Sequence, residues 1–529
     1  MKNWLLFVFC ISLISIWPFF KKGYFESHDG EWMVIRFSAF HQTLADGQFP
    51  VRFVDRLNNN YGYPVLNFLY PLPFYLAEIP KILGFGFVDS IKIVFAASAI
   101  ASSVAVFWAL SQIFTKTASF TGAILYLFVP YRFVDLYVRG SIGENLAFVF
   151  VPMILGSIYK IAKGEKIFLP ILAVAISLLI LSHNVIAVLF VPFFWLVSIF
   201  SSPKYKFRIT FAFVGGILIS AFFWLPALID LQYVRLSQIK VSNISDHLVN
   251  LKSLIVPEWG YGPAPSSSGG FSPQLGLVSQ AIFITAFYLR FIKKHKNLIV
   301  DFMLIIVAAS IFLMTKSSSM LWQKIPIIDV IQFPWRLLSV IVFASAFLSA
   351  FIIQNTKKTQ IATLLIVSAA IISTLFYTKP SVFVDKGDGF YSTNEDSTTV
   401  RDEYLPLWVT EKPQQRAVSK IEVERGDANI LKATIKHSYY RAKINSLGDS
   451  VIKVNTIYFS GWQVKADGQI TPIDYKNKSG LITFGLSPGI HEVIINYASS
   501  PIHRLSEYIS LAAFLVVGGY YLWIRKNSL

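Results

Sequence analysis

The sequence predicts a polytopic α-helical membrane protein of about twelve transmembrane helices, with a small β-rich domain outside the membrane near its C-terminus. Hydrophobic residues make up 54% of the 529 residues and charged residues only 15%, which is too apolar for a soluble chain of this length. Apolar runs recur up to position 377, many of them near the ~20 residues that a helix needs to cross a bilayer. From 378 to 505 apolar and polar residues alternate instead, as they do in half-buried strands.

The first apolar run is predicted to be a retained helix, because Pro18, Phe19 and Phe20 follow it where a cleaved signal would have small residues. The other apolar runs are separated by short polar gaps that contain most of the basic residues. The predicted helices cover residues 4–20, 88–114, 117–134, 143–160, 167–182, 184–200, 208–230, 276–292, 298–314, 336–353, 360–377 and 506–524.

The distribution of basic residues predicts the orientation. When the sides of the membrane alternate along the chain, one side receives most of the lysines and arginines of the short loops, with Glu165 as its sole acid. Such a bias marks the cytoplasmic side. We therefore expect a multi-pass protein of the cytoplasmic (inner) membrane with both termini in the cytoplasm. The net charge of +17 is then explained by orientation in the bilayer, and no nucleic acid is expected as a partner.

The predicted outer side holds the long segments 21–87, 231–275, 315–335 and 378–505. The cytoplasmic loops are too short for a nucleotide-binding domain, so any chemistry is expected on the outer face. We divide the chain into a transmembrane core (1–377), an extracytoplasmic antiparallel β-sandwich (378–505) and a final helix with a cytoplasmic tail (506–529). Asp467-Gly468, between two alternating runs, is a two-residue hairpin signal within the sandwich.

The first outer segment opens with His28, Asp29 and Glu31, a few residues beyond the first predicted helix. A carboxylate at the membrane–water boundary can take a proton from an acceptor hydroxyl or hold a divalent cation. The alternative is an ordinary solvated loop that begins with polar residues.

The second outer turn contains Arg132, Asp135, Arg139 and Glu144. Charged groups are costly near hydrocarbon, so these side chains are expected to face protein or water. Arginine suits phosphate because its planar fork makes paired hydrogen bonds. A structural ion-pair cluster is the equal alternative.

Two further polar residues are predicted at outer helix ends. His183 lies where two helices turn, and Arg336 begins the tenth predicted helix. The alternative for His183 is a structural histidine whose hydrogen bonds are all made within the protein. The alternative for Arg336 is an anchor at the membrane interface.

Several long motifs resemble known families. The resemblance is to bacterial membrane proteins labelled 6-pyruvoyl-tetrahydropterin synthase-related and, in the last third, to YfhO-type membrane proteins. It rests on "FPVRFVDRLNNNYGYPVLNFLYPLPFYL", "YRFVDLYVRGSIGEN", "LSHN" and "QFPWRLL" for the first family, and on "RDEYLPLWV" and "YFSGWQVKADGQ…LSPGIHEVIINYAS" for the second. The pterin label does not describe the chemistry here, because that synthase needs a zinc-binding histidine cluster that eight scattered histidines do not supply.

The layout is also similar, more remotely, to the C-type (GT-C) glycosyltransferases, which use polyprenyl-phosphate sugars as donors. The resemblance implies that the family's acidic motif falls on Asp29, with Glu31 near it, and its second acid on Asp135 or Glu144. Gly30 separates Asp29 from Glu31, whereas the commoner motif has adjacent acids. A divalent cation (Mg or Mn), if one is used, would be held by Asp29 and Asp135.

The predicted function is transfer of a sugar from a polyprenyl-phosphate-linked donor to a glycan, lipid or protein acceptor outside the cytoplasm, in assembly of the cell envelope. Asp29 and Glu31 are the predicted catalytic residues. The predicted substrate-binding residues are His28, Arg132, Asp135, Arg139, Glu144, His183 and Arg336. The alternatives are a transporter or flippase of lipid-linked glycans, and a non-catalytic membrane assembly factor.

Overall fold

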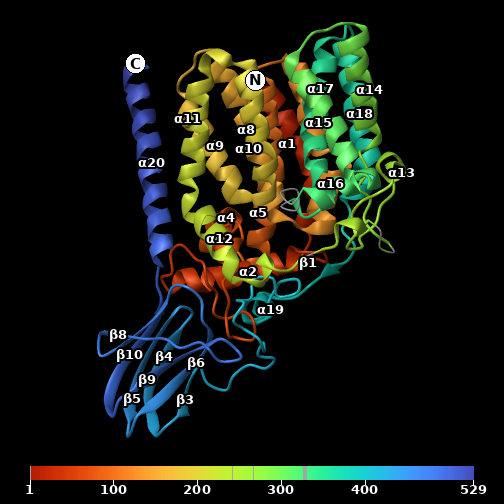
Figure 1. Cartoon of the computed structure of the whole chain (residues 1–529). Helices are drawn as coiled ribbons and strands as arrows, with labels where there is room; N and C mark the ends of the chain where they lie inside the picture. Colours follow the sequence, from red (N-terminus) through yellow and green to blue (C-terminus); the bar gives the residue numbers. More distant parts are fainter. Residues whose placement is uncertain (1, 241, 266, 268, 326–330, 529) are drawn as a thin grey trace.

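The computed structural model describes residues 2–240, 242–265, 267, 269–325 and 331–528. A bundle of long helices forms the larger part, and a β-rich part hangs from one end of it (Figure 1). Both ends of the chain lie at the opposite end of the bundle (Figure 1). The bundle comprises α1 (Lys2–Ile16), α5 (Phe87–Leu110), α6 (Lys116–Leu127), α8 (Ile142–Ala162), α9 (Phe168–Ser182), α10 (Asn184–Ser201), α11 (Lys206–Ile219), α12 (Ala221–Asp230), α14 (Leu277–Phe287), α15 (Leu298–Met314), α17 (Leu338–Gln354), α18 (Thr359–Thr374) and α20 (Pro501–Ser528).

Every apolar run that predicted a membrane helix contains helix in the structure. Among the described residues, seven helices are long and apolar enough to cross a membrane. There is an eighth span if α11 and α12, which meet at a bend of 67°, are counted together. The predicted helical membrane fold is thus confirmed, and the number of about twelve crossings stays a prediction.

The central helix of the bundle is α17. In the apolar stretch that contains it, 94% of the residues are buried inside the protein, compared with 17% for α20 at the edge. Small residues allow this central packing: a Cβ on Gly122 of α6 would come within 2.7 Å of the Ala346 carbonyl oxygen of α17. Because α20 stands apart at the edge, most of its surface is left for lipid (Figure 1).

The first outer segment folds into a layer across the end of the bundle. Its helices are α2 (Gly30–Ala45), α3 (Val65–Phe68) and α4 (Leu72–Ile82), and α2 lies between the bundle and the β-rich part (Figure 1). Strand β1 (Tyr24–Phe25) pairs antiparallel with β2 (Phe383–Val384), and the short helix α19 (Asp388–Thr393) packs on α2. This layer therefore joins the beginning of the chain to the segment that follows α18.

The β-rich part has two antiparallel sheets with a shared hydrophobic core. The five-stranded sheet has the order β4-β5-β10-β7-β8 and the three-stranded sheet the order β3-β6-β9. The predicted hairpin lies between β7 and β8, where Asp467 and Gly468 have φ values of 52° and 82°, as a type I′ turn requires. The strands are β3 (Ile421–Arg425), β4 (Ala428–Lys436), β5 (Tyr439–Ser446), β6 (Ser450–Ile457), β7 (Trp462–Ala466), β8 (Gln469–Thr471), β9 (Leu481–Leu486) and β10 (Gly489–Tyr497). The predicted antiparallel β-sheet region is confirmed, and the exact division of the chain into 1–377, 378–505 and 506–529 stays a prediction.

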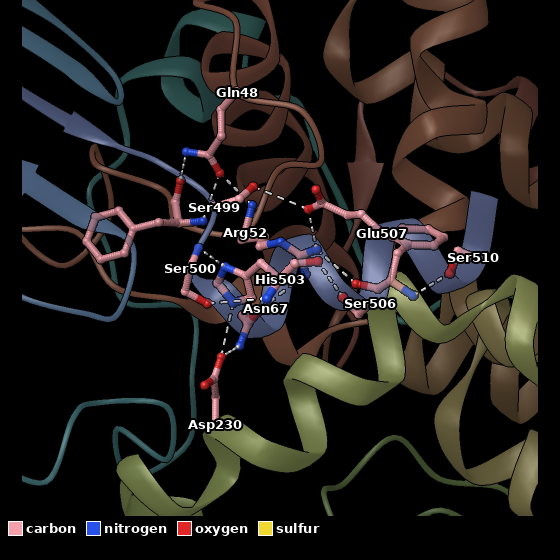
Figure 2. A network of polar contacts seen from close by, with 12 residues as sticks. Gln48, Arg52, Asn67, Asp230, Ser499, Ser500, His503, Ser506, Glu507 and Ser510 are labelled. Carbon is pink, nitrogen blue, oxygen red and sulfur yellow. Dashed lines mark hydrogen bonds and ion pairs between the residues drawn. The ribbon is translucent and has the colours of Figure 1, made fainter. Parts of the chain in front are cut away.

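A network of polar contacts joins the layer across the end of the bundle, α12 and the start of α20, which follows the last strand (Figure 2). Arg52 of the first outer segment donates to Glu507 of α20 over 3.0 Å. Asn67 donates to the Asp230 carboxylate of α12 over 2.9 Å, and Nε2 of His503 lies 3.2 Å from the same oxygen. Buried polar groups of this kind are costly unless they are paired. The network therefore fixes the base of α20, and with it the sheets, against the outer layer.

Candidate functional site

The first outer segment meets the second outer turn at the start of α2. The backbone N–H of His28 donates to the Val138 carbonyl over 2.9 Å, and that of Asp29 donates to the Arg139 carbonyl over 2.8 Å. Gly140 makes this approach possible, because it has a φ of +65° and a Cβ there would lie 2.8 Å from the Cα of Gly30. The two segments in which the sequence predicted site residues therefore lie side by side.

Asp29 is positioned by its backbone rather than by its side chain. It precedes the first turn of α2, where the partial positive charge of the helix stabilises a carboxylate. The N–H of Gly30 is taken by the Ser27 hydroxyl over 3.2 Å. Within the described part of the chain, the partly exposed Asp29 carboxylate has no hydrogen bond or ion pair of its own. Its oxygen atoms are available to a substrate.

A buried ion-pair cluster adjoins the backbone of Asp29. The turn η2 (Val134–Arg139) is a π-helical turn that follows the short helix α7 (Pro130–Phe133), and such turns are frequent at functional sites. Nη1 of Arg139 lies 2.9 Å from Asp135 and 2.5 Å from Glu144, and its guanidinium stacks 4.5 Å from the Trp335 ring centre. Glu144 also accepts a hydrogen bond from Tyr131 over 2.6 Å. Arg139 therefore forms ion pairs with two carboxylates, and these pairs hold the turn whose backbone bonds Asp29.

His183 and Arg336 belong to the same neighbourhood. The charges of Arg139, Arg336 and Glu144 all act on the His183 imidazole. Nδ1 of His183 accepts from the Ile186 N–H at the start of α10 over 3.3 Å, and its ring packs on Tyr70 at 5.0 Å.

Arg336 retains unused hydrogen-bonding capacity. It donates from Nη1 to the Ile331 carbonyl (3.0 Å) and the Gln332 side chain (2.8 Å), while its buried Nε has no partner. Arg336 thus has an N–H that no described group accepts.

His28 contacts the loop that follows α13 (Leu251–Ile255). Its Nε2 lies 3.0 Å from the Tyr261 carbonyl and must carry the proton, because a carbonyl only accepts. Burial lowers the pKa of the His28 imidazole, and the Tyr261 carbonyl and the Asp29 carboxylate oppose that shift. The neutral ring therefore fastens this loop beside Asp29.

Glu31 has partners of its own. Its carboxylate pairs with Lys386 over 2.8 Å and accepts from the Tyr391 hydroxyl over 3.2 Å. These contacts hold the segment that contains α19 on α2. Glu31 is thus engaged structurally, and its predicted catalytic role stays a prediction.

Arg132 is fully enclosed. It donates to Ser102 over 3.1 Å and to Asn145 over 2.9 Å, and its guanidinium lies 4.2 Å from the Phe148 ring centre. All three partners are in α5 and α8. These contacts join two helices, while the buried Nε and Nη1 of Arg132 have no partner among the described residues. The predicted role of Arg132 in substrate binding stays a prediction.

The predicted metal ligands, Asp29 and Asp135, lie on the two chain segments that meet at the start of α2. One oxygen of Asp135 faces Arg139, and Asp29 lies on the other chain segment. Across the described ranges, no group of three or more His, Cys, Asp or Glu side chains is arranged to hold a metal ion. A divalent cation stays a prediction, and no step below involves one.

Sequence reasoning missed the contribution of the segment around 398–404. Arg36 of α2 donates from Nε to the Thr398 hydroxyl over 3.1 Å, which folds this segment back onto α2. Glu403 is then buried, at 8% exposure, and its Oε2 has no hydrogen-bond partner. Burial raises the pKa of Glu403 to about 7, and the charges of Asp402 and Asp29 add to the shift. Glu403 is thus a buried acid in the segment that Arg36 holds on α2. The motif "RDEYLPLWV" displayed this acid, but nothing in its spacing connected it to Asp29.

Comparisons with known proteins agree with the sequence resemblance. The model of a family described as "6-pyruvoyl-tetrahydropterin synthase related domain; membrane protein" matches residues 66–381. An uncharacterized protein of Lactococcus lactis subsp. cremoris (strain MG1363) is 23% identical over 243 residues, which are 43% of this chain and 39% of that protein. The chain therefore spans about two fifths of the length of that relative.

The comparison with solved structures gives an arabinofuranosyltransferase and an oligosaccharyltransferase. The arabinofuranosyltransferase AftD from Mycobacteria has a TM-score of 0.45 and 13% identity, over 74% of this chain and 28% of that chain. The oligosaccharyltransferase of Archaeoglobus fulgidus has a TM-score of 0.43 and 15% identity, over 74% of this chain and 56% of that chain. Because the family match at residues 66–381 extends over more than half of the 529 residues, the chain belongs to the 6-pyruvoyl-tetrahydropterin synthase-related family of membrane proteins.

Proposed function

We propose that the protein is a membrane glycosyltransferase that moves a sugar from a polyprenyl-phosphate-linked donor to an acceptor outside the cytoplasm, in assembly of the cell envelope. The observation that carries this proposal is the Asp29 carboxylate. It is fixed through its backbone to Arg139, it is partly exposed, and it has no partner within the described part of the chain. A general base needs this combination, because it must be positioned and yet free to accept a proton.

In the proposed reaction the acceptor hydroxyl oxygen attacks the anomeric carbon of the donor sugar. Asp29 takes the hydroxyl proton as this bond forms, and the bond between the sugar and the phosphate oxygen breaks. The phosphate leaves with the electron pair, so negative charge grows on its oxygen atoms. Arg336 has an N–H free of partners in the described structure and would donate to that charge. Arg139 acts as a positioning residue, because its own donors serve Asp135 and Glu144.

The layer formed by α2 suits such a reaction. It lies across the end of the bundle, where a lipid tail could remain between helices while the sugar phosphate reaches Asp29 (Figure 1). The proposal places this end on the extracytoplasmic side. The β-sheets beyond it would cover the acceptor side of the site.

The test is transfer of radiolabelled sugar from polyprenyl-phosphate donors by the purified full chain in lipid nanodiscs. Asp29→Asn keeps the side-chain size and removes the base, so turnover should fall by about 100- to 10,000-fold while the thermal midpoint stays near that of the wild type. Glu26→Gln, an exposed acid three positions earlier, is the matched control and should keep wild-type turnover.

Near-normal transfer by Asp29→Asn would overturn the assignment of the base. If the wild type moves the lipid-linked headgroup across vesicles without losing the sugar, the protein is a flippase instead. Absence of both activities with every donor would favour the assembly factor.

A further inference from the structure

A cavity with charged and apolar lining residues lies near the start of α2, at the ends of two membrane helices. It has a volume of about 540 Å³ and is lined by the end of the first span, the first turns of α5 and residues 385–388. Its charged lining residues are Lys21, Lys22, Asp89, Lys92, Asp385, Lys386 and Asp388. Asp29 and Arg336 do not line it, so the transfer reaction does not account for it.

The ends of two candidate membrane spans put the cavity at the expected boundary of the bilayer. The first span ends at Phe20 and the next begins at Phe87, and residues of both ends line the cavity. Its rim is apolar and open: Phe20, Phe85 and Ile93 are 74%, 46% and 37% exposed. Lysines next to an apolar rim at this depth can hold a charged headgroup in the interface while a hydrocarbon chain stays in the bilayer.

Most of the charges in the cavity are already paired. Lys22 contacts Asp385 at 2.7 Å and Lys92 contacts Asp89 at 3.3 Å. Asp388 accepts from the N–H groups of Phe87 and Val88 at the start of α5, over 2.8 and 3.4 Å. The aspartates are thus engaged, which limits their repulsion of an anion.

Lys21 differs from these lysines. Its Nζ lies 4.9 Å from the ring centres of both Trp17 and Phe383, and no described carboxylate pairs with it. Two aromatic faces hold an ammonium group in place without neutralising it. Lys21 is therefore a lining residue whose positive charge is held by two aromatic rings and is paired with no described carboxylate.

We propose that this cavity binds the phosphate headgroup of a membrane lipid, with Lys21 as its principal cation and the lipid chain lying across Phe20 and Ile93. A free phosphate ion would have no use for the exposed apolar rim, whereas a lipid contacts both parts. Lys386 lines the cavity and also pairs with Glu31 in the first turn of α2. The bound lipid would thus adjoin the layer that carries Asp29, although its binding does not depend on sugar transfer.

The test measures binding of a dye-labelled short-chain phosphatidic acid to the purified full chain in neutral detergent, by fluorescence anisotropy. Lys21→Gln should weaken binding by at least about fivefold, which corresponds to about 1 kcal/mol for one charge at close range. Lys316→Gln, an exposed lysine outside the cavity, is the matched control and should bind like the wild type. Lys22→Gln is a second variant. The Lys22 side chain is 88% exposed, so its replacement should leave the fold intact.

Two competitors identify the source of the phosphate. Unlabelled phosphatidic acid should displace the probe, whereas inorganic phosphate or diacylglycerol at the same concentration should not. Equal affinities in the wild type, Lys21→Gln and Lys22→Gln would overturn the proposal. Displacement by inorganic phosphate would identify a free-anion site, and displacement by diacylglycerol an apolar groove, and either result would also overturn it.

Discussion

The carboxylates of Asp29 and Glu31 stand two positions apart at the start of α2, and the helix gives them different surroundings. Asp29 precedes the helix and is bonded through its backbone to Arg139, while Glu31 pairs with Lys386. Each helical residue turns the chain by roughly 100°, so residues two apart face nearly opposite sides. This divergence leaves Asp29 free for a substrate and uses Glu31 to fasten the segment 386–391.

The pH dependence of stability should reveal Glu403. Burial raises its pKa to about 7 from an ordinary value of 4.5. The folded protein therefore holds this proton between about pH 4.5 and 7, where the unfolded chain has lost it. Its contribution to stability is complete below pH 4.5 and is lost as the pH rises through 7, by a total of about 3 kcal/mol.

Thermal midpoints measured from pH 4.5 to 8 test this contribution. Glu403→Gln should lack the part of the fall in stability with rising pH that the Glu403 carboxyl group causes. The variant is expected to be more stable than the wild type at pH 8, because the amide that replaces the carboxyl group stays neutral. Glu26→Gln is the control and should follow the wild-type curve. A Glu403→Gln curve parallel to that of the wild type would show that the carboxyl group is not buried in solution.

Replacement of Arg336 tests the predicted phosphate donor. Arg336→Lys keeps the charge and loses the planar fork, so affinity for a polyprenyl-phosphate donor should weaken by about tenfold. Arg290→Lys is the matched control, because Arg290 forms a two-pronged ion pair with Asp301 (2.5 and 2.7 Å) outside the cluster. Its donor affinity should match that of the wild type. Unchanged affinity in Arg336→Lys would favour the interfacial anchor that the sequence left open.

The sequence could identify Asp29 but not Glu403, for a physical reason. Asp29 lies only a few residues beyond the apolar run 4–20, so hydropathy alone places it near the predicted membrane boundary. Glu403 reaches the site only because Arg36 binds Thr398 and folds the chain back onto α2. A contact between segments so far apart leaves no periodic signal in a single sequence.

At the scale of elements, the membrane helices were predictable because hydrocarbon tolerates only apolar runs with internally bonded backbones. Helix α2 lacked that signal. It buries Arg36, Ser38 and Thr43 together with its apolar residues, so its sequence does not display an apolar stripe of helical period. The outer layer was therefore predicted as a long loop, although it contains the helices that position Asp29.

The contact between the loop at Gly140 and the start of α2 is open to a direct test. In Gly140→Ala the new Cβ would lie 2.8 Å from the backbone of Gly30, at a φ of +65° that alanine also disfavours. The start of α2 must then shift away, and turnover should fall by about tenfold or more because the base is displaced.

Gly47→Ala provides the control for backbone strain. Gly47 has a φ of +99° at the end of α2, and nothing lies within 4 Å of a Cβ built there. This variant should lose about 1 kcal/mol of stability and keep its turnover. If Gly140→Ala behaves like Gly47→Ala in both thermal midpoint and turnover, the contact does not position Asp29.

At the scale of the whole molecule, the outer layer connects parts that the sequence assigned to separate domains. The segment 383–404 follows α18, yet it pairs with β1, packs α19 on α2 and contributes Glu403. Arg52 and Asp230 bind Glu507 and His503 at the base of α20, the helix that follows the last strand (Figure 2). A truncation after Tyr377 would therefore remove the sheets and also disrupt the outer layer that carries the site.

The proposed orientation of the whole molecule yields the last prediction. Both termini lie at one end of the bundle, and α2 and the sheets lie at the other (Figure 1). The loops at the end with the termini are predicted to be cytoplasmic because they hold the excess of lysine and arginine. A reporter enzyme that works only in the cytoplasm should be active when it is fused after Lys206, Lys296, Lys358 or Lys526. It should be silent after Gly270 or Gly480, because these residues belong to the predicted outer segments.

Cysteine substitutions at the same positions, probed with a reagent that does not cross the membrane, give the complementary pattern and control for fusions that misfold. Activity after Gly480 together with a shielded cysteine at that position would reverse the orientation, and Asp29 would then face the cytoplasm.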